Sequence, residues 1–151
     1  GYKQLSDYKK DDYKSKSFVK ELQDINTCDS IDLIKVFGIG PTLSSRILKY
    51  RNRLGGFYDF EQLSEVYNIK PEIIEEIRTK FVLKVENIKT IKINSANFSD
   101  LIKHPYLNKN EVNILLNYRK QHGNYNTMDD LLKTLVLDEE KINKLKNYIE
   151  F

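Results

Sequence analysis

Two glycines that flank a hydrophobic residue, Gly38 and Gly40 around Ile39, form the part of the sequence best suited to hold a ligand. Glycine adopts tight left-handed conformations readily and lets a ligand approach the backbone closely. Pro41 follows, and proline is favoured in the first turn of a helix. The free N–H groups at such a helix start carry partial positive charge. We therefore predict a phosphate-binding hairpin in which Ile39 plugs into the core.

A basic face follows the hairpin on the same predicted helix. Arg46, Lys49 and Arg53 are spaced i, i+3 and i+7, so they share one helical face. Beside a phosphate hairpin this face would follow a DNA backbone, although an ordinary solvated surface is the alternative. Phosphate contacts carry no sequence information, so little sequence preference is expected. The candidate DNA-binding residues in this half of the chain are Gly38, Ile39, Gly40, Thr42, Arg46, Lys49 and Arg53.

Four short helices are expected to position the hairpin. Apolar periodicity predicts one helix that ends near Val36 and a second from Pro41 to Leu54, where two glycines stop it. Asp59 is suited to cap a third helix, and Pro71 to open a fourth. The sequence therefore predicts an all-α unit built from two helix–turn–helix pairs.

The chain repeats itself with a shift of 68 residues, because residues 24–82 align on residues 92–150 without a gap. We predict two small domains at residues 24–82 and 92–151, joined by an extended linker at residues 83–91. Residues 1–23 form a charged segment outside the repeat, either a tail or the end of a preceding repeat.

The second repeat lacks the features of the first hairpin. Its segment Tyr106–Lys109 contains no glycine, and the basic face is replaced by Ile114, Asn117 and Gln121. Lys109 is kept as a candidate phosphate contact, but this copy fits better as a packing module that makes the first copy rigid or presents a protein-binding face. The second hairpin within each repeat also lacks glycine, so we expect it to be structural.

Charge is distributed unevenly along the repeats. The net charge is +3, which is mild for a nucleic-acid-binding protein. The first half of each repeat is basic, at +2 for residues 24–54 and +3 for residues 92–122, whereas the second halves are acidic, at −3 and −2. The basic halves favour DNA contact through the first hairpins, and the acidic halves favour the alternative of a protein-interaction module.

Residues that recur in both repeats are expected to be structural. Arg51 and Arg119 are predicted to make a charge or backbone contact near the first helix of their repeat, and Asn26 and Asn94 to cap the entry to that helix.

Enzymatic chemistry and metal binding find little support. The single cysteine, Cys28, excludes an internal disulfide and a cysteine zinc site, and is expected to be a small buried hydrophobic residue. The two histidines, His104 and His122, are far apart in the sequence, and no nucleophile lies in a recognisable motif. We expect no enzyme, no catalytic residue, no metal site and no cofactor. No stretch is apolar enough for a membrane span, so no membrane contact is expected.

The run Gly38–Pro41, together with Tyr50-Arg51, Gly55–Phe57 and Leu63, resembles the double helix-hairpin-helix domain of the competence protein ComEA family, and the tandem layout resembles ComEA-related proteins of Bacteroidetes-type bacteria. The resemblance covers roughly residues 24–151. It implies two tandem four-helix, SAM-like domains that bind double-stranded DNA through the phosphate backbone, with a monovalent cation at the hairpin in some members. It further implies a role in DNA uptake or processing and a full-length form anchored outside the cytoplasm.

The leading hypothesis is binding of duplex DNA without sequence preference. The rival is a protein-interaction or structural module on the same fold that has lost DNA binding. A third reading, an accessory part of a larger DNA enzyme, would require sequence beyond these 151 residues.

Overall fold

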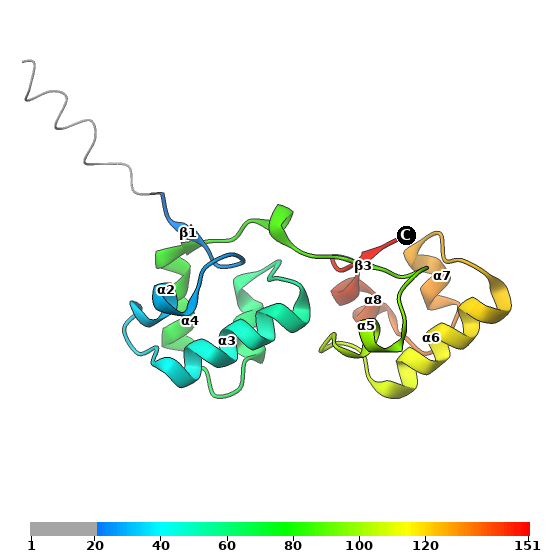
Figure 1. The fold of residues 1–151 in the computed structure, drawn as a ribbon, viewed down its shortest axis with the longest axis horizontal. Helices are drawn as coiled ribbons and strands as arrows, with labels where there is room; N and C mark the ends of the chain where they lie inside the picture. Colours follow the sequence, from blue (N-terminus) through cyan, green and yellow to red (C-terminus); the bar gives the residue numbers. More distant parts are fainter. Residues whose placement is uncertain (1–20) are drawn as a thin grey trace, which may run out of the picture.

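The computed structural model describes residues 21–151 and shows two helical repeats in succession (Figure 1). The mostly helical class predicted from the sequence is confirmed. The first repeat contains β1 (Gln23–Asp24), α2 (Ser30–Ile34), α3 (Pro41–Leu54), the 3₁₀ helix η1 (Phe60–Glu65), α4 (Pro71–Lys80) and β2 (Phe81–Val82). The second contains β3 (Ile91–Lys92), α5 (Phe98–Ile102), α6 (Lys109–His122), α7 (Met128–Leu132), α8 (Glu139–Leu145) and β4 (Ile149–Glu150). The predicted N-terminal segment 1–23 lies almost wholly outside the described residues.

Short parallel strand pairs close each repeat, although the sequence predicted none. β1 pairs with β2 so that Gln23 lies opposite Phe81, and β3 pairs with β4 so that Ile91 lies opposite Ile149. Two-residue strands are too short to show the alternation that reveals a strand in a sequence. The third helix of the first repeat is the 3₁₀ helix η1 and not an α-helix, and Asp59 caps it as expected.

Asn26 and Asn94 hold the start of each repeat against its middle. The side chain of Asn26 accepts a hydrogen bond from the Phe57 N–H at 2.7 Å and donates to the Phe57 carbonyl at 2.9 Å. Asn94 makes the same pair of bonds with Tyr125, at 2.7 and 2.8 Å. The expectation that these asparagines cap a helix is therefore wrong. Spacing alone could not show the partner, because it lies 31 residues away along the chain.

Arg51 and Arg119 make the backbone contacts expected of them. Arg51 Nη1 donates to the carbonyl oxygens of Ile25 and Cys28, at 3.1 and 2.6 Å. Arg119 makes the corresponding two bonds in the second repeat, at 2.9 and 2.7 Å. Cys28 is buried as predicted, and burial raises the pKa of its thiol to about 11. Each arginine thus satisfies two backbone carbonyls in the loop before α2 or before α5.

A polar network joins the two repeats. Tyr148, which follows α8, is 0% exposed and belongs to the hydrophobic core of the first repeat. Its hydroxyl donates to the Gly56 carbonyl at 2.6 Å and accepts from Gln62 Nε2 at 2.8 Å. Gln62 also donates to the Tyr106 hydroxyl at 2.9 Å, and that hydroxyl donates to the Glu65 carboxylate at 2.5 Å. Because the Tyr148, Gln62 and Tyr106 groups all have partners in this network, the interface is specified by geometry as well as by apolar contact.

The linker predicted at residues 83–91 packs along the first repeat. It contains the 3₁₀ turn η2 (Val85–Asn87), and its last residue begins β3. The Lys89 N–H donates to the Gly55 carbonyl at 2.8 Å, and Asn87 Nδ2 donates to the Asp24 carboxylate at 2.7 Å. A Cβ on Gly55 would lie 2.3 Å from the Lys89 carbonyl oxygen, so glycine permits this close passage. Within residues 21–151, no helix is both long and apolar enough to traverse a membrane.

Candidate nucleic-acid interface

The first hairpin connects α2 to α3 and needs glycine at Gly38. This residue has a φ of +91°, in the left-handed region, and a Cβ there would lie 2.4 Å from Cδ1 of Ile73 on α4. Ile39 is buried in the core, as predicted. Ile39 thus anchors the hairpin in the core, and Gly38 packs closely against Ile73 of α4.

Gly40 leaves the start of α3 open. Its backbone is extended, with φ −98° and ψ −175°, so the prediction of a left-handed conformation there is wrong. Gly40 is the N-cap, and an N-cap residue takes an extended conformation that any amino acid can adopt. A Cβ on Gly40 would meet no atom within 4 Å. The N–H groups of Thr42 and Leu43 make no hydrogen bond to another described residue, and Thr42 is exposed.

The second hairpin of the first repeat, residues 67–71, has the same design as residues 37–41. Each run has an aromatic residue, a left-handed residue, isoleucine, the N-cap and proline. Asn68 has a φ of +62°, which asparagine tolerates better than most residues. The view of this hairpin as merely structural rested on its lack of glycine. The sequence did contain a signal for the shared backbone turn, because residue types occur in the same order in both runs.

The α-helices that follow these two hairpins differ from the others in capping. Neither Gly40 at α3 nor Lys70 at α4 provides a side-chain cap. The other five α-helices within residues 21–151 have side-chain caps from Asp29, Asn97, Asn108, Thr127 and Asp138. A cap uses one of the free donors of the first turn, whereas the uncapped starts leave the Thr42 and Leu43 N–H groups of α3 and the Glu72 N–H of α4 for an external acceptor. Both open starts belong to the first repeat.

The three basic residues predicted to share one face of α3 lie in different environments. The Arg46 guanidinium lies 5.0 Å from the centre of the Tyr67 ring, beside the second hairpin. Lys49 is exposed. Arg53 is also exposed, but its Nε donates to the Lys103 carbonyl at 3.1 Å, at the junction with the second repeat. The structure therefore brings Arg46 toward the hairpins and ties Arg53 to the repeat junction.

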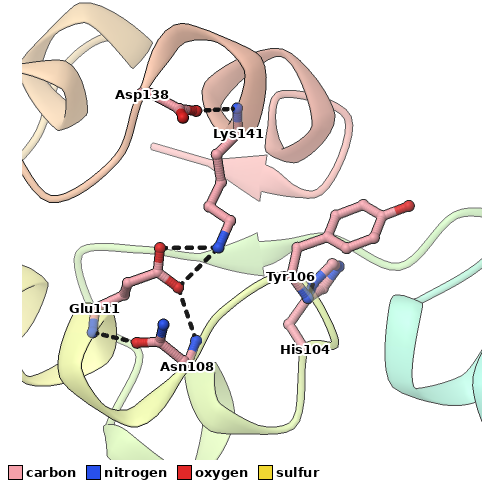
Figure 2. Close-up of polar contacts among 6 residues, drawn as sticks. All are labelled: His104, Tyr106, Asn108, Glu111, Asp138 and Lys141. Carbon is pink, nitrogen blue, oxygen red and sulfur yellow. Dashed lines mark hydrogen bonds and ion pairs between the residues drawn. The ribbon is translucent and has the colours of Figure 1, made fainter.

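In the second repeat a carboxylate of the chain itself occupies the start of α6. Glu111 is buried and accepts from the Asn108 N–H at 2.9 Å, while Asn108 Oδ1 accepts from the Glu111 N–H at 2.8 Å (Figure 2). Lys141 Nζ donates to both Glu111 oxygens at 2.9 Å. Lys109, the first residue of α6, is exposed beside this cluster. The Asn-x-x-Glu pattern is a capping-box signature that was visible in the sequence.

The first hairpin of the second repeat is used for packing. Tyr106 stands where the first repeat has Gly38, and it reaches Glu65 across the junction. His104 is 1% exposed, its Nδ1 accepts from the Tyr106 N–H at 3.1 Å, and its ring lies 4.7 Å from that of Tyr148. Burial lowers the pKa of His104 to about 4, so the ring is neutral at pH 7. The side chains of this hairpin therefore pack against other parts of the same chain.

The repeated helix–turn–helix layout with its two hairpin turns is matched by a family model described as "Helix-hairpin-helix motif", over residues 20–82 and again over residues 86–150. The chain belongs to this family. Helix-hairpin-helix motifs generally bind nucleic acids, which agrees with the open helix starts of the first repeat. Within residues 21–151, no group of three or more His, Cys, Asp or Glu side chains is placed to hold a metal ion.

Two curated relatives share the name "Endonuclease/exonuclease/phosphatase family domain-containing protein 1". The one from Xenopus laevis is 20% identical, and the match covers 86% of this chain and 27% of the relative. The one from Danio rerio is 19% identical, and the match covers 84% of this chain and 26% of the relative. The chain thus spans about a quarter of the length of these relatives. No solved structure matches it significantly.

Proposed function

We propose that this helix-hairpin-helix protein binds double-stranded DNA without sequence preference, and that the first repeat makes the main contact. The observation that carries the proposal is the contrast in helix capping. The starts of α3 and α4 are open, whereas in the second repeat the start of α6 is filled by Asn108 and Glu111 and that of α8 by Asp138. Open N–H groups at a helix start are suited to an anion such as phosphate.

Basic side chains near the open starts extend this contact. Lys70 is the N-cap of α4, Arg46 lies over Tyr67, and Lys49 is exposed on α3. With three cations neutralising three phosphates, affinity should fall about 40-fold between 50 and 200 mM salt. Arg53 and Lys109 stay candidate contacts of lower weight, because the first is bonded at the repeat junction and the second adjoins the buried Glu111 carboxylate.

The second repeat then supports the first. The hydroxyls of Tyr148 and Tyr106 bond to Gln62 and hold the second repeat against the first. The same contact supports the rival function, a protein-interaction module, because in it a hairpin of this fold packs against another folded repeat of the chain.

The resemblance and the relatives support two proposals for the process that the protein serves. The resemblance to the ComEA family favours DNA uptake or processing by a protein anchored outside the cytoplasm. The relatives' name favours a second setting, in which residues 21–151 hold DNA for an enzyme domain elsewhere in a longer chain. In both settings we assign binding and no catalysis to these residues.

Gly40→Asp tests the proposed function without damaging the fold. Aspartate at Gly40 has open space for its side chain and would cap α3 as Asp138 caps α8. We expect it to stabilise the protein by roughly a few tenths of a kcal/mol. We expect it to weaken DNA binding, measured by fluorescence anisotropy at 50 and 200 mM salt. Asn108→Asp is the matched control in the second repeat and should leave binding unchanged. Unaltered binding by Gly40→Asp would sink the proposal.

A further inference from the structure

Exposed aromatic rings stand at the tips of both hairpins in the first repeat. Phe37 is 92% exposed and Tyr67 is 77% exposed. Each residue lies three positions before the N-cap of the following helix, Gly40 or Lys70. The corresponding position of the second repeat holds the exposed aliphatic residue Leu135, so exposure alone does not mark a binding surface. What sets the first repeat apart is that both of its hairpins carry an aromatic ring there.

A groove of about 490 Å³ separates the two hairpins. Phe37, Gly38, Asn68 and Lys70 line it on the hairpin side, Leu43 and Ile73 add apolar side chains, and Glu72 and Glu76 supply carboxylates. This volume lies within the range of about 300 to 1,000 Å³ typical of ligand pockets. The groove is therefore large enough for a flat group and lies directly between the two open helix starts.

The lining of the groove suits a nucleobase better than a phosphate. Leu43 and Ile73 offer apolar contact to the face of a base, whereas the Glu72 and Glu76 carboxylates repel phosphate. A carboxylate can instead accept hydrogen bonds from the amino group of a base. A phosphate beside that base would meet the open start of α3 and the cations nearby, away from Glu72 in the first turn of α4.

Tyr67 is already arranged for stacking. The Arg46 guanidinium lies 5.0 Å from its ring centre. A planar cation over one face holds the ring in place and adds positive charge beside it. The other hairpin offers Phe37 without such a partner among the cation–ring contacts of residues 21–151. The Tyr67 ring is thus held by Arg46, whereas no cation lies over the Phe37 ring among the described residues.

We propose that Phe37 and Tyr67 stack on bases that have left the double helix, so that the first repeat prefers DNA with unpaired or unstacked bases over continuous duplex. This inference rests on the proposed function, because it assumes that the phosphates lie on the same two hairpins. Stacking of a base on an aromatic side chain tolerates any base sequence, so the absence of sequence preference is retained.

The test compares two DNA probes of equal length under the same salt. One is a continuous duplex, and the other carries a short single-stranded gap with 2-aminopurine at an unpaired position. We expect the gapped probe to bind about 5- to 150-fold more tightly, the range for one stacked base. Stacking on the protein should also change the fluorescence of the 2-aminopurine base.

Three variants separate stacking from general surface effects. Phe37→Ala and Tyr67→Ala should each remove most of the preference for the gapped probe. Phe37→Ala should leave affinity for the continuous duplex nearly unchanged, whereas Tyr67→Ala also removes the ring on which Arg46 lies and should weaken duplex binding slightly. Leu135→Ala is the matched control, because Leu135 is 90% exposed and lies three residues before the Asp138 N-cap in the second repeat. It should alter neither affinity.

The outcomes distinguish this inference from the function on which it rests. Equal affinity for both probes, or a preference that survives both alanine variants, overturns the inference and leaves duplex binding intact. Failure to bind either probe overturns both. Self-association measured by sedimentation that Phe37→Ala abolishes, together with no effect on DNA, would assign the tips to protein contact and also overturn the inference.

Discussion

Removing one hydroxyl at the junction should destabilise both repeats together. In Tyr148→Phe the Gly56 carbonyl loses its donor, which is 2.6 Å away in the native protein. Gln62 Nε2 keeps its bond to Tyr106, so the main loss is one buried acceptor without a partner. Such a group costs about 1 to 3 kcal/mol. For a protein of this size, that corresponds to a fall in Tm of roughly 2 to 12 °C.

Circular dichroism melting and urea unfolding measure this change. Tyr125→Phe is the matched control, because the Tyr125 hydroxyl donates at 2.6 Å to the Leu115 carbonyl inside the second repeat. If the junction couples the repeats, each variant shifts one shared transition. Amide hydrogen exchange in α3 and α6 should then accelerate together in both variants.

Two results would refute this reasoning. A fall in Tm below about 1 °C for Tyr148→Phe would show that the Gly56 carbonyl finds another donor at no cost. Two separate transitions, only one of which moves in Tyr125→Phe, would show that the repeats unfold independently despite the bonds between them.

Three further predictions follow from the same structure. Gly38→Ala should destabilise the protein by about 1 to 3 kcal/mol in urea unfolding, because the φ of +91° and the contact with Ile73 both oppose a Cβ, whereas Asn68→Gly should be tolerated. Arg51→Ala should cost about 2 to 4 kcal/mol in the same assay, since it leaves two carbonyl oxygens without their charged donor. Because the pKa of buried His104 is about 4 and that of the unfolded chain is near 6.5, the unfolded state binds more protons between these values. Stability should therefore fall by up to about 3 kcal/mol as the pH drops through that window, and His104→Asn should flatten this dependence.

The repeat and the helices of the fold could be predicted from the sequence because their signals are local or internal. Apolar spacing located α3, and Pro41 and Pro71 marked the starts of α3 and α4. Comparison of the two copies singled out Arg51 as structural. The strand pairs and the asparagine contacts were missed or misread because their partners are distant in sequence, as with Asn26 and Phe57.

The candidate site was predicted only in part. The hairpin around Gly38 was identified, but glycine was given too much weight, since Asn68 makes a similar turn and Gly40 needs no left-handed conformation. Glu111 covers the start of α6, and its carboxylate is paired with Lys141, which lies 30 residues further along the chain. The sequence shows a capping box there, but only the fold shows that this carboxylate is buried and paired.

The place of Tyr148 in the core of the first repeat has a consequence for the order of folding during synthesis. Tyr148 follows Val82, the last residue of β2, by 66 residues. At about 5 to 20 residues per second, the ribosome needs roughly 3 to 13 s to add that length. For this interval the first repeat exists without one of its own core side chains and with the Gly56 carbonyl unbonded to it. The nascent hairpins are therefore carried by an incomplete domain, which becomes complete only when the second repeat has been made.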